Sequence, residues 1–230
     1  MKKKHQNEID GAGKAIAPPV PPVSTARDIF VFGRLENEVA LPTIKKLLKL
    51  NAADPKAPIN LYINSSGGNG YNADGIIAVM HSIEAKVNTI CLGHALSGAC
   101  EILAAGTGTR SAYEFATLMF HQTLWEADGD ITNLEIQAVQ GRRFREAQIE
   151  VLHRASGQSK EVLRKDIERD HYLTAREALD YGFLDTIIEF TGTRHLKNET
   201  EQKKMAEPTK APARAAANST KKSGNSKKTK

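Results

Sequence analysis

The chain has 230 residues, of which 40% are hydrophobic and 26% are charged, and its formal net charge is +5. No apolar run approaches the roughly 20 residues that span a bilayer, and no apolar segment follows the basic start, so neither a membrane span nor a secretory signal is predicted. The positive charge lies at the ends. Residues 194–230 carry 11 Lys and Arg against 3 Asp and Glu, whereas residues 25–193 carry 17 against 22, a balance that disfavours a nucleic-acid-binding core.

The two ends of the chain differ from its middle in composition. Residues 1–25 are polar and then proline-rich, which predicts a disordered or polyproline arm. Residues 193–230 mix Lys, Ala, Ser, Thr and Pro without apolar periodicity, which predicts a disordered basic tail. One domain is therefore expected at 26–192. Its two cysteines, Cys91 and Cys100, lie in apolar segments and indicate free thiols in a reducing cytoplasm.

Strand-like and helix-like segments alternate through the middle of the chain. Strands are expected at 28–32, 59–63, 87–92, 116–120 and 184–188. Helices are expected at 36–50, 72–84, directly after residue 97, at 132–155, at 160–166 and at 174–181, where a Thr followed three residues later by Glu forms a capping box. Repeated strand–helix–strand units predict an α/β fold with a mostly parallel sheet.

One serine stands where a predicted strand gives way to a helix of small residues. The segment reads Gly93-His-Ala-Leu-Ser-Gly-Ala-Cys-Glu101, with Ser97 at the junction. A serine at such a turn has an exposed hydroxyl, and the backbone N–H groups that follow it begin a helix. This arrangement suits both a nucleophile and a donor to a developing oxyanion.

A serine nucleophile needs a base within hydrogen-bond reach and a third group that orients the base. Among the seven histidines, His121 is the best candidate because it directly follows an apolar strand, where loops build sites in parallel α/β folds. Two carboxylates could orient it. Asp166 and Asp170 flank one short turn, and their positions alone do not separate them.

A diglycine, Gly67-Gly68, follows the strand expected at 59–63. Such a pair allows the backbone to approach a ligand, and its N–H groups could form an oxyanion hole. The surrounding sequence lacks the Gly-Lys-Ser/Thr ending of a phosphate loop and the acidic partner of a dinucleotide site. Taken alone, the diglycine is weak evidence.

Five motifs occur in one order along the chain, and together they resemble the proteolytic subunit of the Clp protease over roughly residues 26–190. They are Leu61-Tyr-Ile-Asn-Ser-Ser-Gly-Gly68, Gly93-His-Ala-Leu-Ser97, Leu118-Met-Phe-His-Gln122, Glu168-Arg-Asp-His-Tyr-Leu-Thr-Ala175 and Glu177-Ala-Leu-Asp-Tyr-Gly-Phe-Leu-Asp185. The resemblance implies a ClpP/crotonase-like α/β fold of stacked strand–helix–strand units with a protruding long helix. It also implies a serine endopeptidase that cleaves unfolded proteins or peptides and requires no metal or cofactor.

The resemblance assigns a role to each motif. Ser97 corresponds to the nucleophile, His121 to the base, and Asp170 rather than Asp166 to the orienting carboxylate. The backbone N–H groups of Gly68 and Gly98 correspond to the oxyanion donors. The residues expected to contact the polypeptide substrate are Gly67, Asn69 and Leu124.

The resemblance also implies partners. Members of the family stack two heptameric rings into a closed chamber, with the helix expected at 132–155 as the handle between rings, and receive unfolded chains from a hexameric AAA+ ATP-dependent unfoldase. Here Asn60 and Ser82 stand where the family places aromatic residues that grip the unfoldase, and the proline-rich arm differs from the usual N-terminal segment. Loss of apolar anchors predicts weak docking of a standard unfoldase. No membrane partner is expected.

Two further departures lie near the predicted site. Glu101 occupies a position in the helix after Ser97 where an aliphatic or aromatic residue is usual, and a buried carboxylate there would need a partner or a raised pKa. The segment 124–130 replaces a glycine-rich hairpin that the family uses to bind extended peptides. Together these departures predict an altered substrate preference.

Two other functions are also compatible with the sequence. The chain could be a catalytically idle ring subunit that assembles with an active partner. It could also be a crotonase-type acyl-CoA enzyme, which shares the broad fold and an oxyanion hole. Such an enzyme would not need Ser97, His121 and Asp170 together.

Overall fold

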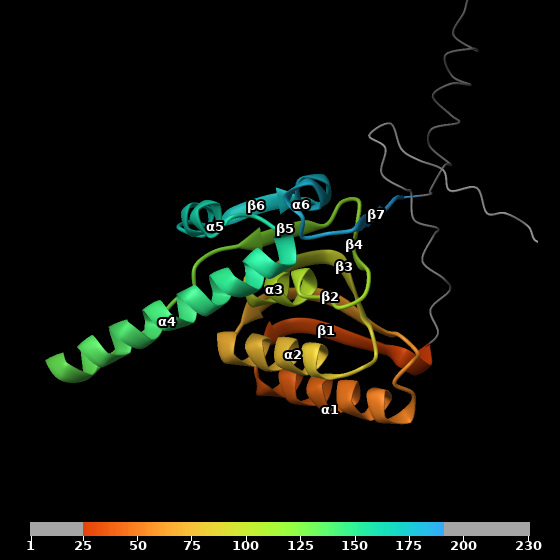
Figure 1. The fold of residues 1–230 in the computed structure, drawn as a ribbon, viewed down its shortest axis with the longest axis horizontal. Coiled ribbons are helices and arrows are strands. Elements are labelled where there is room, and N and C mark those ends of the chain that lie inside the picture. Colours follow the sequence, from red (N-terminus) through yellow and green to blue (C-terminus); the bar gives the residue numbers. More distant parts are fainter. Residues whose placement is uncertain (1–24, 191–230) are drawn as a thin grey trace, which may run out of the picture. The chain divides into compact units, whose positions relative to one another are not determined.

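The computed structural model describes residues 25–190. The tail predicted at 193–230 and all but the last residue of the arm predicted at 1–25 lie outside the described residues. The described part is an α/β fold with a mostly parallel sheet, stacked strand–helix–strand units and a long helix that extends away from the sheet, as predicted (Figure 1). None of the helices described is both long enough and apolar enough to cross a membrane.

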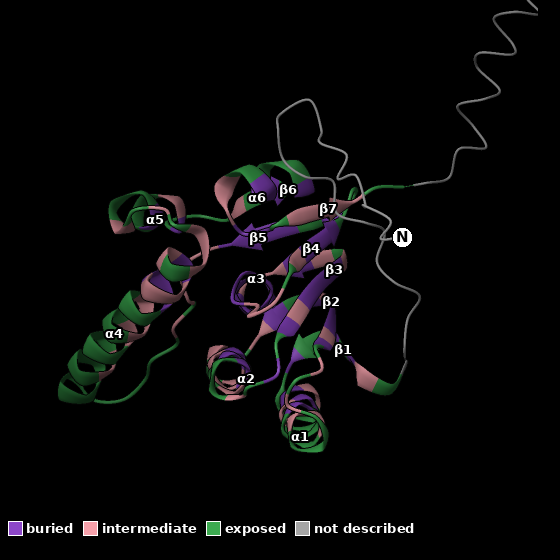
Figure 2. Ribbon diagram, turned by 45° about the vertical axis from the view of Figure 1, so that its right-hand side comes forward, coloured by how far each residue is buried: buried purple, intermediate pink, exposed green. Residues whose placement is uncertain are grey.

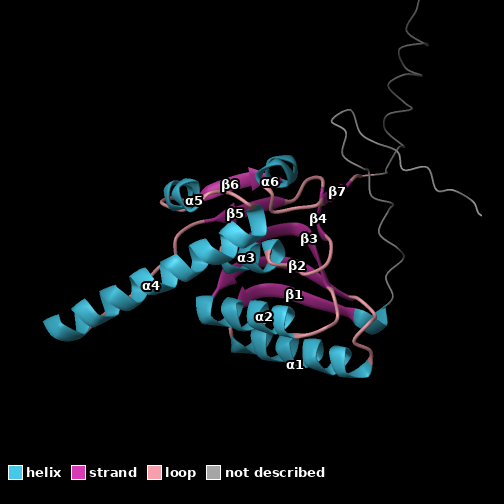
Figure 3. Cartoon of the chain, in the orientation of Figure 1, coloured by secondary structure: helices cyan, strands magenta, loops and turns pink. Residues whose placement is uncertain are grey.

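Within the described residues, seven strands form the sheet, whose arrangement is drawn in Figure 3. Its main path runs β1-β2-β3-β4-β7, while β5 pairs with β3 and β6; every pair is parallel except β5 with β6. The strands are β1 (Asp28–Leu35), β2 (Ile59–Gly68), β3 (Val87–Leu96), β4 (Arg110–Tyr113), β5 (Thr117–Phe120), β6 (His171–Thr174) and β7 (Thr186–Ile188). The sequence did not predict β4 or β6, each only four residues long, and it ended β2 and β3 too early.

Three helices lie along the same side of β1, β2 and β3 and bury the apolar core against them (Figure 2). These three are α1 (Asn37–Ala53), α2 (Gly70–Ser82) and α3 (Gly98–Ala104). The other helices of the described residues are α4 (Ile131–Ser156), α5 (Lys160–Asp166) and α6 (Ala175–Tyr181), and a 3-10 turn, η1 (Thr25–Arg27), precedes β1. The capping box predicted at Thr174 is present, with Glu177 as its partner. All seven residues of α3 are buried, which explains why this helix consists of small and apolar residues apart from one Glu.

The long helix α4 is anchored only at its C-terminal part. Asp130 caps its first turn by accepting a hydrogen bond from the Asn133 N–H at 3.0 Å, and Gly157 ends it in the left-handed conformation. Its buried residues, Gln148, Ile149 and Leu152, all lie near the C-terminal end. The N-terminal part is exposed (Figure 2). Its large apolar side chains include Ile131, Ile136 and Val139. Such a helix face is typical of a surface that another chain covers.

The central strand β3 changes partner along its length. Its first part, Thr89 to Cys91, pairs with β4, and its last part, His94 to Leu96, pairs with β5. The fork lets β5 continue the sheet only beside the end of β3. This brings the residues that follow β3 and β5 to one edge of the sheet.

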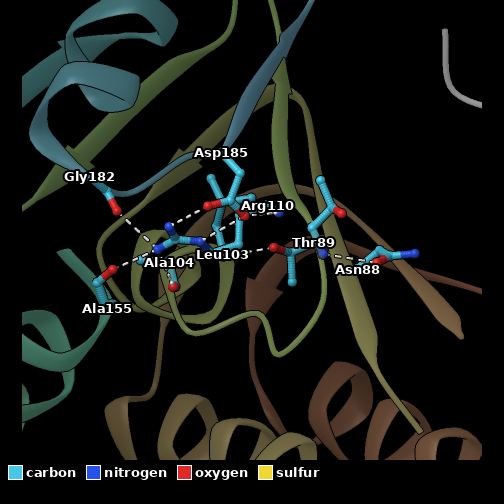
Figure 4. A network of polar contacts seen from close by, with 9 residues as sticks. Asn88, Thr89, Leu103, Ala104, Arg110, Ala155, Gly182 and Asp185 are labelled. Atoms are coloured by element: carbon cyan, nitrogen blue, oxygen red, sulfur yellow. Dashed lines mark hydrogen bonds and ion pairs between the residues drawn. The ribbon is translucent and has the colours of Figure 1, made fainter. Parts of the chain in front are cut away.

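One arginine ties three helix ends to the last strands (Figure 4). Arg110 Nη1 donates to the carbonyl oxygens of Ala104, Ala155 and Gly182, at 3.2, 2.7 and 2.9 Å, and Nη2 lies 2.7 Å from Asp185 Oδ1. A guanidinium at helix C-termini satisfies orphan carbonyl groups and interacts favourably with the helix dipoles. Burial favours a higher pKa for the Asp185 carboxyl, but the hydrogen bonds and charge of Arg110 outweigh burial and hold that pKa below its usual value.

Asn60 belongs to a line of polar side chains across the start of the sheet. Its Nδ2 donates to Asp28 Oδ1 at 3.0 Å, its Oδ1 accepts from Asn88 Nδ2 at 3.0 Å, and Asn88 Oδ1 accepts from the Thr109 N–H at 2.9 Å. An aromatic side chain at position 60 would break this line. Ser82 lies exposed at the end of α2. Asn60 is thus hydrogen-bonded on both sides within the sheet, and Ser82 is a polar residue at an exposed position.

Both cysteines are free and buried. Burial raises the pKa of the Cys91 thiol to about 12 and raises the pKa of the Cys100 thiol even further. Thiols with such high pKa values stay protonated and unreactive near neutral pH.

Candidate active site

Ser97 lies at the sharp turn between β3 and α3. Its φ of 55° and ψ of −131° are unusual for a residue with a side chain, and no other non-glycine residue in the described range has a positive φ. The Ser97 N–H donates to the Met119 carbonyl oxygen at 2.8 Å, so the pairing of β3 with β5 continues through the turn. Strained backbone of this kind persists only where the surrounding structure holds it in place, and it concentrates at functional sites.

The strand register brings His121 to Ser97. Leu96 at the end of β3 pairs with Met119 in β5, so the residue just after β5 lies beside the residue just after β3. His121 Nε2 is 2.8 Å from Ser97 Oγ, a distance that allows the imidazole to accept the hydroxyl proton.

A second register brings Asp170 to His121. In the antiparallel pair of β5 with β6, Phe120 faces His171, so the residue before β6 meets the residue after β5. Asp170 Oδ1 lies 3.1 Å from His121 Nδ1. Asp166 instead accepts a hydrogen bond from the Tyr181 hydroxyl at 2.8 Å. The structure thus places Asp170, and not Asp166, beside His121, a difference that the positions of the two carboxylates in the sequence did not show.

The other histidines of the described range have local roles. His81 Nε2 bonds the Ala105 carbonyl oxygen at 3.0 Å, and His153 Nδ1 bonds that of Gln158 at 2.7 Å. His171 stacks on Phe120 with ring centroids 4.9 Å apart. His94 lies within β3, and His5 and His195 lie outside the described residues.

The diglycine packs directly against the serine turn. Gly67 has a φ of 79°, and a Cβ atom there would lie 2.6 Å from the Leu96 carbonyl oxygen and 2.8 Å from Ser97 Cβ. Its N–H donates to Ser65 Oγ at 3.2 Å. Gly68 has a φ of 153°, and a Cβ atom there would lie 2.7 Å from the Leu35 backbone nitrogen. Only glycine fits this contact between the end of β2 and the turn at Ser97.

A cavity of about 550 Å³ opens at Ser97 and His121. Of the other predicted site residues, Gly68, Asn69, Gly98 and Leu124 line it, whereas Gly67 and Asp170 do not. The Asn69 side chain caps α2 by accepting from the backbone N–H groups of Tyr71 and Asn72. The sequence did not single out three aromatic residues that also line the cavity, Tyr71, Trp125 and Phe144.

Glu101 is buried in the same cavity wall, with 6% of its surface exposed. Its Oε1 accepts a hydrogen bond from Gln148 Nε2 at 2.7 Å, and the same Nε2 donates to the His121 carbonyl oxygen at 2.9 Å. Burial raises the pKa of Glu101 to about 7; the hydrogen bond from Gln148 opposes this rise, and the charge of Asp74 adds to it. The expectation that this carboxyl needs a partner or a raised pKa is confirmed in both respects.

We expect Glu101 to make the folded protein less stable as the pH rises. Its carboxyl releases its proton near pH 4.5 when exposed to water and near pH 7 in the fold. The free energy of unfolding should therefore fall between these two values. Glu101→Gln, which cannot ionise, should gain on the order of 2–3 kcal/mol relative to wild type between pH 4.5 and pH 8. Urea unfolding of both proteins at both pH values measures this gain, and equal pH dependence would contradict the expectation.

No three His, Cys, Asp or Glu side chains within residues 25–190 gather as a metal site would require.

Comparison with known proteins identifies the family. The model of the Clp protease family matches residues 17–191. The chain belongs to the Clp protease family. It is 39% identical over 167 residues to ATP-dependent Clp protease proteolytic subunit 2 of Mycobacterium leprae and of Mycobacterium tuberculosis, covering 71% of this chain and 78% of each relative. It is 38% identical over the same length to ATP-dependent Clp protease proteolytic subunit 1 of Mycolicibacterium paratuberculosis, of which it covers 79%.

The family match agrees with the resemblance drawn from the five motifs. In this family member, two contacts connect three polar side chains: Ser97 after β3 contacts His121 after β5, and His121 contacts Asp170 before β6.

Proposed function

We propose that this Clp protease family member is a serine endopeptidase whose nucleophile, base and orienting carboxylate are Ser97, His121 and Asp170. The observation that carries the proposal is the continuous contact from Ser97 Oγ through the imidazole to Asp170, at 2.8 and 3.1 Å. A serine–histidine–aspartate line is the geometry that acyl-transfer peptidases require. The peptidase domain is proposed to span residues 26–192.

In the proposed mechanism, His121 Nε2 takes the proton of Ser97 as Oγ attacks the carbonyl carbon of a peptide bond. Asp170 accepts from the Nδ1–H of His121, holds the required tautomer and stabilises the imidazolium that forms. The imidazolium then gives its proton to the leaving amine, and the acyl group stays on Oγ. Water, activated by the same histidine, hydrolyses this ester and restores the serine.

The backbone N–H groups of Gly68 and Gly98 are the proposed donors to the tetrahedral oxyanion. Both residues line the cavity beside Ser97. The N–H of Gly98 is the first of α3, where no carbonyl of the same helix can accept it. Loss of one oxyanion donor in a serine peptidase typically lowers kcat by about 100-fold or more.

The proposal includes assembly and a polypeptide substrate. The relatives are named as subunits of an ATP-dependent protease, which supports an oligomer, of two stacked heptamers by the family resemblance, and an ATP-driven unfoldase as a partner. The exposed apolar side chains on the N-terminal part of α4 support a contact between subunits. The buried, unreactive thiols of Cys91 and Cys100 suit a cytoplasmic protein.

Labelling with a fluorophosphonate probe tests the proposed function. The probe should bind wild type covalently at Ser97 and should not bind Ser97→Ala. Asp166→Asn is a matched control, because Asp166 contacts Tyr181 rather than His121, and it should label like wild type. A folded, oligomeric wild type that stays unlabelled would instead indicate a catalytically idle ring subunit.

A further inference from the structure

The cavity beside Ser97 has an acidic floor. Glu101 follows Ser97 by one turn of α3, roughly 6 Å along the helix axis, and both residues line the same cavity. Within residues 25–190, no Lys or Arg forms an ion pair with Glu101 and no hydrogen bond reaches its Oε2. Asp74, on α2, adds a second negative charge nearby. A buried carboxyl in such surroundings gains stability from a cation that enters the cavity.

The walls of the cavity are aromatic. Tyr71 and Phe144 meet edge to face with centroids 5.0 Å apart, and Trp125 lies 6.3 Å from Phe144. Two glycines allow these rings to lie close: a Cβ atom at Gly70 would be 2.8 Å from Phe144 Cζ, and one at Gly141 would be 3.2 Å from the Trp125 ring. Aromatic faces accept the methylene stem of Lys or Arg and attract its charged end.

The remaining charges of the lining do not neutralise Glu101. Arg34 also lines the cavity, but its guanidinium is exposed and lies 3.4 Å from Glu36 Oε1. Glu126 lines the cavity with an exposed side chain and is negative as well. Gln148 holds the Glu101 carboxyl in place and ties it to the His121 backbone, so the acidic floor is fixed relative to the proposed base.

We propose that this cavity binds a lysine or arginine side chain of the substrate, from the residue that contributes the carbonyl group attacked by Ser97, with the Glu101 carboxylate as its ionic partner. This inference rests on the proposed peptidase function and adds a substrate class to it. In this proposal the attacked carbonyl group of the substrate lies at Ser97 Oγ. The extended lysine or arginine side chain of the same substrate residue is long enough to reach Glu101, one helical turn farther along α3. Glu101 is thus a specificity-determining residue, and Tyr71, Trp125 and Phe144 enclose the stem.

Two fluorogenic peptides that differ only in the residue before the cleaved bond test the inference. One carries lysine and the other norleucine, which has a neutral stem of similar length. At pH 8, above the pKa of about 7, the Glu101 carboxyl is ionised. Wild type should then cleave the lysine peptide with a kcat/KM about 10- to 100-fold higher than the norleucine peptide, because hydrogen bonds to charged groups are strong. The difference should lie mainly in KM.

Glu101→Gln keeps the shape of the side chain and should lose this preference, so that the kcat/KM values for the lysine and norleucine peptides become about equal in this variant. Glu126→Gln removes the exposed charge and should keep the lysine preference. A wild type that cleaves both peptides equally would overturn the inference and leave the peptidase assignment intact; this comparison needs no variant to fold. A wild type that cleaves neither peptide and takes no fluorophosphonate would overturn the proposed function itself.

Discussion

Replacing Ser97 or His121 by alanine is expected to lower kcat for peptide hydrolysis by about 10⁶-fold, and replacing both should cost no more than either change alone. The reason is that the hydroxyl and the imidazole, 2.8 Å apart, act in one proton transfer. Without Ser97, the imidazole has no hydroxyl to deprotonate. Without His121, the hydroxyl keeps its proton and remains a weak nucleophile. Burst and steady-state kinetics on a fluorogenic peptide measure the three variants against wild type.

Asp170→Asn completes this series. An amide in place of the carboxylate favours the wrong tautomer of His121, so kcat should fall by about 10⁴-fold, less than for the other two positions. Asp166→Asn should keep activity within a few fold, since residue 166 contacts Tyr181 rather than His121 and an amide oxygen can still accept the hydrogen bond from the Tyr181 hydroxyl. Losses that multiply in the double variant Ser97→Ala with His121→Ala would mean that the two residues act independently, against the proposed mechanism.

Gly67→Ala should lower kcat/KM by about 100-fold or more and destabilise the fold. The added Cβ atom would lie 2.6 Å from the Leu96 carbonyl oxygen and 2.8 Å from Ser97 Cβ, so the serine turn must move. Displacing a reacting group by about 1 Å is enough for a loss of this size. The φ of 79° adds strain of roughly 1 kcal/mol for any residue with a side chain.

Gly33→Ala separates the two causes. Gly33 has a φ of 75°, close to that of Gly67, but a Cβ atom there would meet nothing within 4 Å. This variant should lose about 1 kcal/mol of stability and keep wild-type kinetics. Thermal unfolding and kcat/KM measured on both variants decide the matter, and equal kinetic losses at the two positions would show that backbone strain alone is responsible.

The strand–helix order was predictable because apolar periodicity and caps are local signals. The places of Ser97 and His121 near the ends of strands were predictable for the same reason, since apolar strands precede both residues and parallel strands place their ends at one edge. The fork of β3 was not predictable. The fork arises because β4 and β5, each four residues long, both pair with β3. No local sequence pattern predicts that two short strands pair with the same neighbour.

The partner of a buried polar group depends on distant parts of the chain. Sequence position alone did not separate Asp170 from Asp166, and only the family resemblance favoured Asp170. The contact of Asp170 with His121 depends on the pairing of Phe120 with His171, which the unpredicted strand β6 provides. Glu101 was recognised as unusual, but its partner, Gln148, is 47 positions away on the long helix. Trp125 and Phe144 were missed because their approach depends on the glycines that face them, at positions 141 and 70.

The burial of both cysteines has a practical consequence for studying this protein. The whole chain contains only Cys91 and Cys100, and burial keeps both thiols protonated. A Ser97→Cys substitution would place the single accessible thiol of the chain next to the His121 imidazole, where a thiolate is stabilised. An alkylating fluorophore or spin label would then report from one known point in the chain, without removing any native cysteine.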